Sequence, residues 1–129
     1  MPKTLLVADD SLTVRKVIGM VLALEDFQIT AVDNGIDAIA RAREMRPDLV
    51  IADVLMPGRS GYEVCETLKS DPATARIPVI AVTALSRPTD RQRALDFGAD
   101  DYLSKPFDLD VLIATLTRYT SLPEQAQDS

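Results

Sequence analysis

The chain has 129 residues, which is enough for one domain that buries roughly two-thirds of the surface exposed by its unfolded chain. Its net charge of −6 opposes binding to nucleic acid, because that affinity comes mainly from Lys and Arg side chains on phosphates, so we expect no direct contact with DNA or RNA. Histidine is absent, so a bound metal should be a hard ion that prefers oxygen ligands.

The beginning of the chain predicts neither a signal peptide nor a membrane span. Met1–Thr4 leads directly into an apolar run that is too short for either. The single cysteine, Cys65, cannot form a disulfide within the chain, and we interpret it as a small apolar residue in a helix. We therefore expect a protein of a reducing compartment, the cytoplasm, with no membrane contact.

Segments typical of strands and helices alternate through the first part of the chain. Leu5–Ala8 is a continuous apolar run of strand length that ends in two acids, Asp9 and Asp10. The predicted elements that follow are a helix over Leu12–Leu24 capped by Asp10 or Ser11, a strand over Phe27–Val32, and a helix from Ile36 to Met45 that ends before Pro47.

A second buried strand also ends in an acid. Leu49–Ala52 is apolar without polar alternation, which predicts a strand covered on both faces, as in a parallel sheet between helices. Asp53 follows where this strand leaves the sheet, before a turn at Pro57–Gly58. Two predicted strands therefore end in carboxylates.

The alternation continues in the second half. The predicted elements are a helix from Tyr62 that stops near Asp71–Pro72, a strand over Ile77–Thr83, a helix opened by Ser86–Pro88 and ended by Gly98, a strand over Asp100–Ser104, and a helix capped by Asp108 with Leu109, Leu112, Ile113 and Leu116 on one face. The fourth helix has the weakest apolar stripe, so we expect it to be held least firmly. Residues 122–129 show no periodicity, so we predict one domain over residues 1–121 and a flexible C-terminal tail or the start of a linker over 122–129.

Five strands that alternate with five helices predict an α/β fold, in which right-handed crossovers build a parallel sheet with helices on both faces. Ligands of such sheets bind outside the carboxyl ends of the strands. Polar residues lie at or just after four of these ends, namely Asp9, Asp10, Asp53, Thr83 and Lys105. We expect these side chains to share one rim.

The predicted rim suits phosphoryl chemistry. Carboxylates about 4 Å apart repel by on the order of 4 kcal/mol per pair, so they need protons or a cation, and an incomplete set of oxygen ligands is typical of Mg²⁺. Lys105 and the hydroxyl of Thr83 would suit a phosphoryl group beside that ion. In-line transfer to the carboxylate of Asp53 would give an acyl phosphate.

Four motifs carry a resemblance that covers Lys3 to about Tyr119. They are Val7–Ser11, Asp53–Gly58, Val82–Ala84 and Tyr102–Phe107. In this order and spacing, the chain resembles a response-regulator receiver domain of two-component signalling, such as the chemotaxis response regulator. The resemblance implies a flavodoxin-like fold, with a doubly wound five-stranded parallel sheet in the order 2-1-3-4-5 and five helices.

The resemblance also implies a role for each residue of the rim. Asp53 would accept a phosphoryl group from a phosphohistidine on a sensor histidine kinase or phosphotransfer protein. The expected Mg²⁺ ligands are Asp10, Asp53 and the backbone carbonyl of Leu55, with Asp9 helping through water. The expected contacts of the phosphoryl oxygens are Thr83 and Lys105, and the bond between Lys105 and Pro106 would be cis.

The output of such a domain would be a population shift rather than turnover of a substrate. The resemblance implies that Tyr102 turns inward when Thr83 moves toward the phosphoryl group. A partner would read the face made by the fourth helix, fifth strand and fifth helix. That partner is a separate output protein or an attached output domain, and the domain itself would be a monomer or a phosphorylation-dependent dimer.

The chain departs from the family pattern at three positions. Leu55 and Leu85 lie two residues after Asp53 and Thr83, where relatives often have polar side chains that orient an attacking water. Leucine cannot do this, so we predict a long-lived acyl phosphate. Ser60 stands where the family frequently has Asp, which affects only the local turn.

Other interpretations are open at this stage. A phosphatase of the haloacid-dehalogenase kind also phosphorylates an Asp after a buried strand, but it needs a second acid where this chain has Leu55. A receiver that has lost phosphorylation would be a pure interaction module. Each rim residue also has a structural alternative: a helix cap for Asp10, a loop cap for Thr83, a solvated turn for Lys105 and a cover of the sheet edge for Tyr102.

Overall fold

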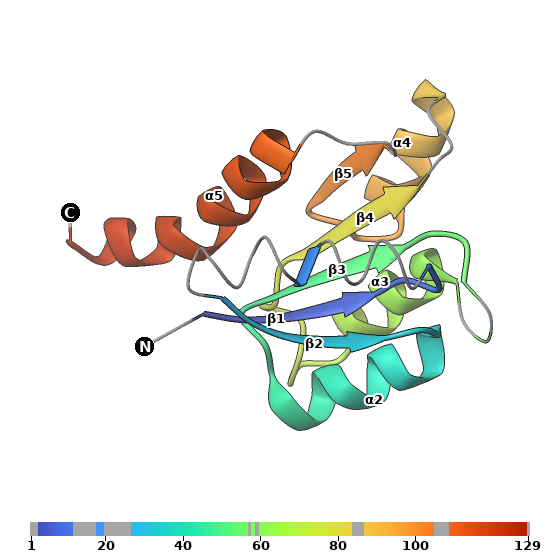
Figure 1. Cartoon of the computed structure of the whole chain (residues 1–129), viewed down its shortest axis with the longest axis horizontal. Helices are drawn as coiled ribbons and strands as arrows, with labels where there is room; N and C mark the ends of the chain where they lie inside the picture. The colour runs from blue at the N-terminus through green and yellow to red at the C-terminus, as the bar shows by residue number, and fades with distance from the viewer. Residues whose placement is uncertain are drawn as a thin grey trace.

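A parallel sheet of five strands forms the centre of the molecule (Figure 1). The computed structural model describes residues 3–11, 18–19, 27–56, 58, 60–83, 87–104 and 109–128. The strands are β1 (Lys3–Ala8), β2 (Phe27–Val32), β3 (Leu49–Asp53), β4 (Val79–Thr83) and β5 (Asp101–Ser104). They pair in the order β2-β1-β3-β4-β5, all parallel, which confirms the predicted fold.

In the described part of the chain the helices are α2 (Gly35–Met45), α3 (Gly61–Ser70), α4 (Pro88–Asp96) and α5 (Leu109–Asp128). Helices α2, α3 and α4 each connect two successive strands, and α5 follows the last strand. Ile18 and Gly19 are helical, as predicted, while the rest of the helix expected over Leu12–Leu24 lies outside the described residues. Within the described part of the chain, no helix combines the length and apolar character needed to cross a membrane.

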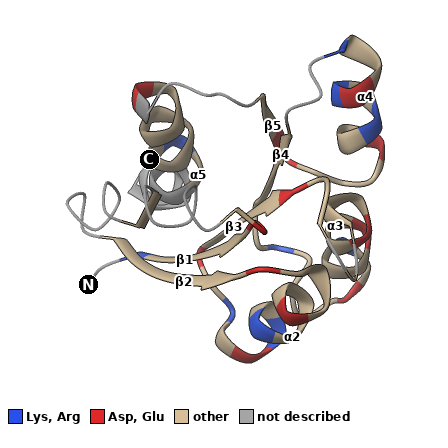
Figure 2. Ribbon diagram, turned by 45° about the vertical axis from the view of Figure 1, so that its right-hand side comes forward, with Lys and Arg blue, Asp and Glu red and all other residues tan. Residues whose placement is uncertain are grey.

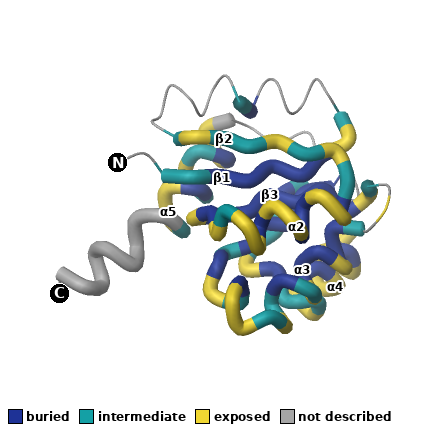
Figure 3. The backbone as a smooth tube through the Cα atoms, turned by 90° about the horizontal axis from the view of Figure 1, so that it is seen from below, coloured by how far each residue is buried: buried dark blue, intermediate teal, exposed yellow. Residues whose placement is uncertain are grey.

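The strands alternate their side chains between two cores, one on each face of the sheet. In β1 and β3, Leu6 and Val50 point toward α2 and α3, whereas Leu5 and Leu49 point toward α5. The second core also contains Ile18. Figure 3 shows β3 buried along its length and β1 buried except at its N-terminal end, with exposed stretches on the outside of α2. Burial of each large apolar side chain stabilises the fold by about 1.5–3 kcal/mol.

Local sequence signals set the helix ends. The side chain of Asn34 accepts the backbone N–H of Asp37 at the start of α2 (2.8 Å), and Ser60 Oγ accepts that of Glu63 at the start of α3 (3.2 Å). Pro88 occupies the first turn of α4, and Gly98 has φ +103° just beyond its end. Both features of α4 confirm the sequence prediction.

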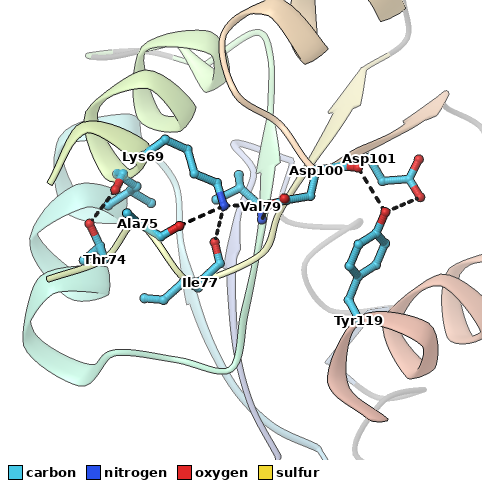
Figure 4. Close-up of polar contacts among 9 residues, drawn as sticks. Lys69, Thr74, Ala75, Ile77, Val79, Asp100, Asp101 and Tyr119 are labelled. Atoms are coloured by element: carbon cyan, nitrogen blue, oxygen red, sulfur yellow. Dashed lines mark hydrogen bonds and ion pairs between the residues drawn. The ribbon is translucent and has the colours of Figure 1, made fainter. Parts of the chain in front are cut away.

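Polar contacts tie the amino ends of β4 and β5 to α3 and α5 (Figure 4). Lys69 Nζ lies 2.7 Å from Asp100 Oδ2 and donates to the carbonyl oxygens of Ile77 (2.8 Å) and Ala75 (3.3 Å). On the other side, the hydroxyl of Tyr119 donates to Asp100 O at 3.0 Å. This end of the sheet is therefore held by structural contacts, which leaves the opposite end for chemistry.

The last helix continues beyond the expected limit of the domain. The backbone of α5 is helical through Asp128, including residues 122–128, where the sequence predicts an irregular tail. The difference arises because Glu, Gln and Ala favour helix by intrinsic propensity, which produces no apolar periodicity. The boundary of the receiver domain near residue 121, and flexibility beyond it, stay predictions.

Candidate functional site

Three acids meet at the carboxyl ends of β1 and β3. Asp9, Asp10 and Asp53 each have a carboxylate oxygen within 4.8 Å of the others. The register explains the proximity, because Ala8 pairs with Ala52 and the acids follow directly. Figure 2 shows acidic residues, in red, at these two strand ends. The geometric expectation from the sequence is therefore met for all three carboxylates.

Local hydrogen bonds orient the two buried acids. Asp9 is 3% exposed and Asp53 is 6% exposed, whereas Asp10 is exposed to solvent. Asp9 Oδ1 accepts the backbone N–H of Ser11 (2.8 Å), and Asp53 Oδ1 accepts that of Leu55 (3.1 Å). In each hydrogen bond the carboxylate accepts the backbone N–H of the residue two positions later in the chain, which orients the side chain at the end of its strand.

This donor set fits a hard divalent cation. Each carboxylate carries a negative charge, and two of the three are withdrawn from bulk water, so their mutual repulsion favours a bound cation. All the donors are oxygen atoms, as Mg²⁺ prefers, and Asp10 leaves the cluster open to solvent on one side. The cluster thus has the ligand chemistry of a magnesium site.

A glycine that the sequence analysis did not single out shapes the loop after Asp53. The N–H of Gly61 donates to Val54 O at 3.0 Å, which brings the start of α3 back to the end of β3. A Cβ atom at Gly61 would overlap the carbonyl oxygen of Asp53 and lie 2.7 Å from Val54 Cα. Only glycine allows this close approach of helix and strand. A glycine at the first position of an amphipathic helix is the signal that could have indicated it.

Thr83 and Tyr102 occupy the neighbouring strands. Thr83 is the last residue of β4 and is fully buried. It follows Val82, whose carbonyl accepts the N–H of Val54 (2.8 Å), so it reaches the same edge as the acids. Tyr102 lies on β5, is half-buried and packs against the core beneath α2, α3 and α4. Lys105, Pro106 and Leu85 lie outside the described residues.

Leu55 leaves its side chain in solvent. The residue is 58% exposed, although its N–H donates to Asp53 Oδ1. The backbone N–H of Leu55 thus lies beside the acid cluster, while the side chain offers no polar group.

Cys65 takes no part in the site. It is fully buried in α3, and burial raises the pKa of its thiol to about 12. The side chain is therefore a neutral thiol at physiological pH, without the thiolate that nucleophilic chemistry needs. This agrees with its predicted role as a small apolar residue in a helix.

Comparison with known families agrees with this geometry. The family described as response regulator receiver domain matches residues 5–117. Among solved structures, the signal receiver domain of a histidine kinase from Syntrophus aciditrophicus is 39% identical, with a TM-score of 0.86 over 92% of this chain and 90% of that chain. The chain belongs to the response regulator receiver domain family.

Other relatives add detail on the site and on protein length. A receiver domain of a sensor histidine kinase from Pseudomonas aeruginosa, 30% identical with a TM-score of 0.86 over 93% of this chain and 98% of that one, has a magnesium ion coordinated in its active-site cleft. The transcriptional regulator RpaA of Synechocystis is 35% identical over 100% of this chain, and the response regulator PleD of Caulobacter vibrioides is 38% identical over 92%. The chain spans only 55% of RpaA and 27% of PleD.

The match fixes the class of function. The chain is a receiver domain of two-component signalling, and such domains are in general signalling modules rather than turnover enzymes. Neither the haloacid-dehalogenase alternative nor the receiver without phosphorylation is favoured by these relatives and the acid cluster.

Proposed function

We propose that Asp53 is the phosphoryl acceptor of this receiver domain. A carboxylate oxygen of Asp53 attacks the phosphorus of a phosphohistidine on a sensor histidine kinase or phosphotransfer protein, the P–N bond breaks, and an acyl phosphate forms while the histidine leaves. The observation that carries the proposal is the convergence of Asp9, Asp10 and Asp53 at one edge of the sheet. Asp53 ends the central strand of that sheet.

The remaining rim residues hold the ion and the phosphoryl group. Asp10, Asp53 and the backbone carbonyl of Leu55 are the proposed direct ligands of Mg²⁺, with Asp9 acting through water. The ion supplies positive charge that offsets the charge of the transferring phosphoryl group. Thr83 donates its hydroxyl hydrogen to a phosphoryl oxygen, and the ammonium group of Lys105 pairs with another.

The output is proposed to be a shift in the face formed by α4, β5 and α5. When Thr83 moves toward the phosphoryl group, Tyr102 turns inward, and a downstream protein or an attached output domain reads the changed face. RpaA is named as a DNA-binding regulator, so a DNA-binding output domain is one candidate for a longer form of this protein. The same face would support a phosphorylation-dependent dimer.

The proposal places the protein in the cytoplasm as a phosphoacceptor without substrate turnover. A buried free thiol at Cys65 suits a reducing compartment. Leu55 stands where a haloacid-dehalogenase phosphatase needs its second acid, which counts against repeated hydrolysis.

The test is phosphorylation from acetyl phosphate in the presence of Mg²⁺, followed by intact mass. The wild-type chain should gain the mass of one phosphoryl group, and Asp53→Asn should gain none. The matched control is Asp96→Asn. This substitution removes an exposed carboxylate of α4 that accepts a hydrogen bond from Gln92 Nε2, and the variant should be phosphorylated like the wild type. Labelling that persists in Asp53→Asn would assign the acceptor to another residue.

A further inference from the structure

Tyr62 joins α3 to α4 through its aromatic ring. It is the second residue of α3 and is 7% exposed. Its ring stacks on Phe97 at a centroid distance of 5.3 Å, and the guanidinium carbon of Arg93 lies 4.8 Å from its ring centroid. Arg93 lies in the last turn of α4 and Phe97 directly follows the helix, so one side chain of α3 holds this end by a stacking and a cation–π contact.

These contacts matter because α4 buries little else. Its buried residues are Asp90 and Ala94, so the helix has a narrow contact with the rest of the domain. A helix with few buried apolar side chains changes position at low free-energy cost. Tyr62 is therefore well placed to influence where α4 lies.

The backbone of Tyr62 is in turn tied to the acceptor strand. It directly follows Gly61, whose N–H donates to Val54 O and whose Cα packs against the carbonyl of Asp53. The start of α3 is therefore in direct contact with the end of β3.

The hydroxyl of Tyr62 has no hydrogen-bond partner among the described residues, although it is buried. A buried hydroxyl without a partner is rare and destabilising. Asp90 is one of the two buried residues of α4 and lies about one helical turn before Arg93, whose guanidinium group contacts the ring of Tyr62. Burial raises the pKa of Tyr62, Arg93 opposes this effect, and the charge of Asp90 raises the pKa further. Asp90 is 5% exposed and accepts hydrogen bonds from Arg87 Nε (3.0 Å) and Nη2 (3.3 Å). Its carboxylate can accept a further hydrogen bond besides these two.

We propose that Tyr62 is a positioning residue that couples the acceptor end of β3 to α4. Its hydroxyl lacks a partner in the arrangement of α4 seen here and donates to the carboxylate of Asp90 in the arrangement that phosphorylation favours. The inference rests on the proposed role of Asp53 as phosphoryl acceptor. It adds a hydrogen bond that forms only in the conformation favoured by phosphorylation.

The test measures the affinity for beryllofluoride, which stands in for the phosphoryl group, by calorimetric titration in Mg²⁺. Tyr62→Phe keeps the ring and removes the hydroxyl, so it should bind beryllofluoride about tenfold more weakly, the loss expected for a hydrogen bond to a charged group. Asp90→Ala should weaken binding similarly. The double variant should bind no more weakly than the single variants, because both remove the same bond.

Tyr119→Phe is the matched control. Its hydroxyl already donates to Asp100 O and Asp101 Oδ2, so its removal should lower the melting temperature and leave beryllofluoride affinity unchanged. Wild-type affinity in Tyr62→Phe, or effects of Tyr62→Phe and Asp90→Ala that multiply, would overturn the inference while leaving the role of Asp53 intact. If the wild type fails to bind beryllofluoride, or Asp53→Asn binds it equally well, the proposed function itself is wrong.

Discussion

At the scale of single residues, hydrolysis of an acyl phosphate on Asp53 depends on the polar groups that its neighbours offer, and the side chain of Leu55 offers none. Leu55 is held beside Asp53 by its N–H, but its exposed side chain has no group that can orient a water molecule. Hydrolysis of an acyl phosphate needs a water directed at phosphorus, and a polar side chain accelerates that step by general base catalysis or orientation. The lifetime of the phosphorylated state should therefore respond to this position.

We expect Leu55→Asn to shorten the lifetime of the acyl phosphate by about tenfold, because its amide can bind an attacking water. The measurement is the decay of the phosphorylated mass after acetyl phosphate is removed. Leu95→Asn is the control, since Leu95 is an exposed leucine near the C-terminal end of α4. Equal lifetimes for wild type and Leu55→Asn would show that this leucine does not limit hydrolysis.

The buried thiol of Cys65 should make the protein sensitive to alkali. Its pKa is raised from 9.0 to about 12 in the fold, so the unfolded chain loses this proton first and stability falls as the pH rises above 9. The unfolding free energy of both proteins should fall between pH 8 and pH 11. The fall should be smaller in Cys65→Ala than in the wild type, by roughly 3 kcal/mol. Urea unfolding at both pH values measures this difference, and identical losses would contradict the raised pKa.

At the scale of elements, the start of α3 lies closer to the acceptor strand than any residue other than glycine allows. The methyl group of Gly61→Ala would meet the backbone of Asp53 and Val54, so helix and strand must separate. We expect a loss of about 3 kcal/mol in unfolding free energy and slower phosphorylation, measured by urea unfolding and by the labelling rate.

The control for this substitution is Gly19→Ala. Gly19 is helical, and a Cβ atom there would meet nothing within 4 Å. Alanine should therefore raise the unfolding free energy by about 0.5–1 kcal/mol, since it restricts the unfolded chain and favours helix. If Gly61→Ala and Gly19→Ala change the unfolding free energy by the same amount, the close approach of α3 to β3 is not the reason for glycine at position 61.

Sequence patterns predicted the elements well where one local signal dominates. The apolar run at Leu49–Ala52 indicated the doubly covered strand, and Phe27–Val32 is a strand with the predicted bounds. The fourth strand begins at Val79 instead of Ile77, because Pro78 has no N–H to donate, although its carbonyl accepts the N–H of Val50 (2.9 Å).

The candidate site could be predicted as far as strand ends determine it. Asp9, Asp10 and Asp53 come together because parallel strands place their carboxyl ends at one edge. Gly61 and Tyr62 were missed because their roles depend on how closely α3 approaches β3 and α4. Such contacts between elements leave no periodic signal along the chain, and Tyr62 resembles any apolar residue on the buried side of a helix.

At the scale of the whole molecule, the acid cluster links magnesium binding to stability. The folded chain holds Asp9, Asp10 and Asp53 together, and the unfolded chain separates them, so charge repulsion opposes folding until a cation binds. A ligand that binds only the folded state stabilises it by mass action, by about 2.7 kcal/mol at one hundred times its dissociation constant.

Asp9→Asn should stabilise the fold in the absence of Mg²⁺ and lose this effect when Mg²⁺ is added. The amide oxygen can still accept the N–H of Ser11, so the local bond survives while one buried charge is removed. In EDTA the variant should be more stable than the wild type by on the order of 2 kcal/mol, because less repulsion opposes folding. In saturating Mg²⁺ this difference in stability should disappear, because the variant site binds the ion more weakly and gains less free energy from it. Urea unfolding at constant ionic strength measures the stability of both proteins in EDTA and in Mg²⁺. A variant that is less stable than the wild type in EDTA would show that these carboxylates do not repel one another in the folded protein.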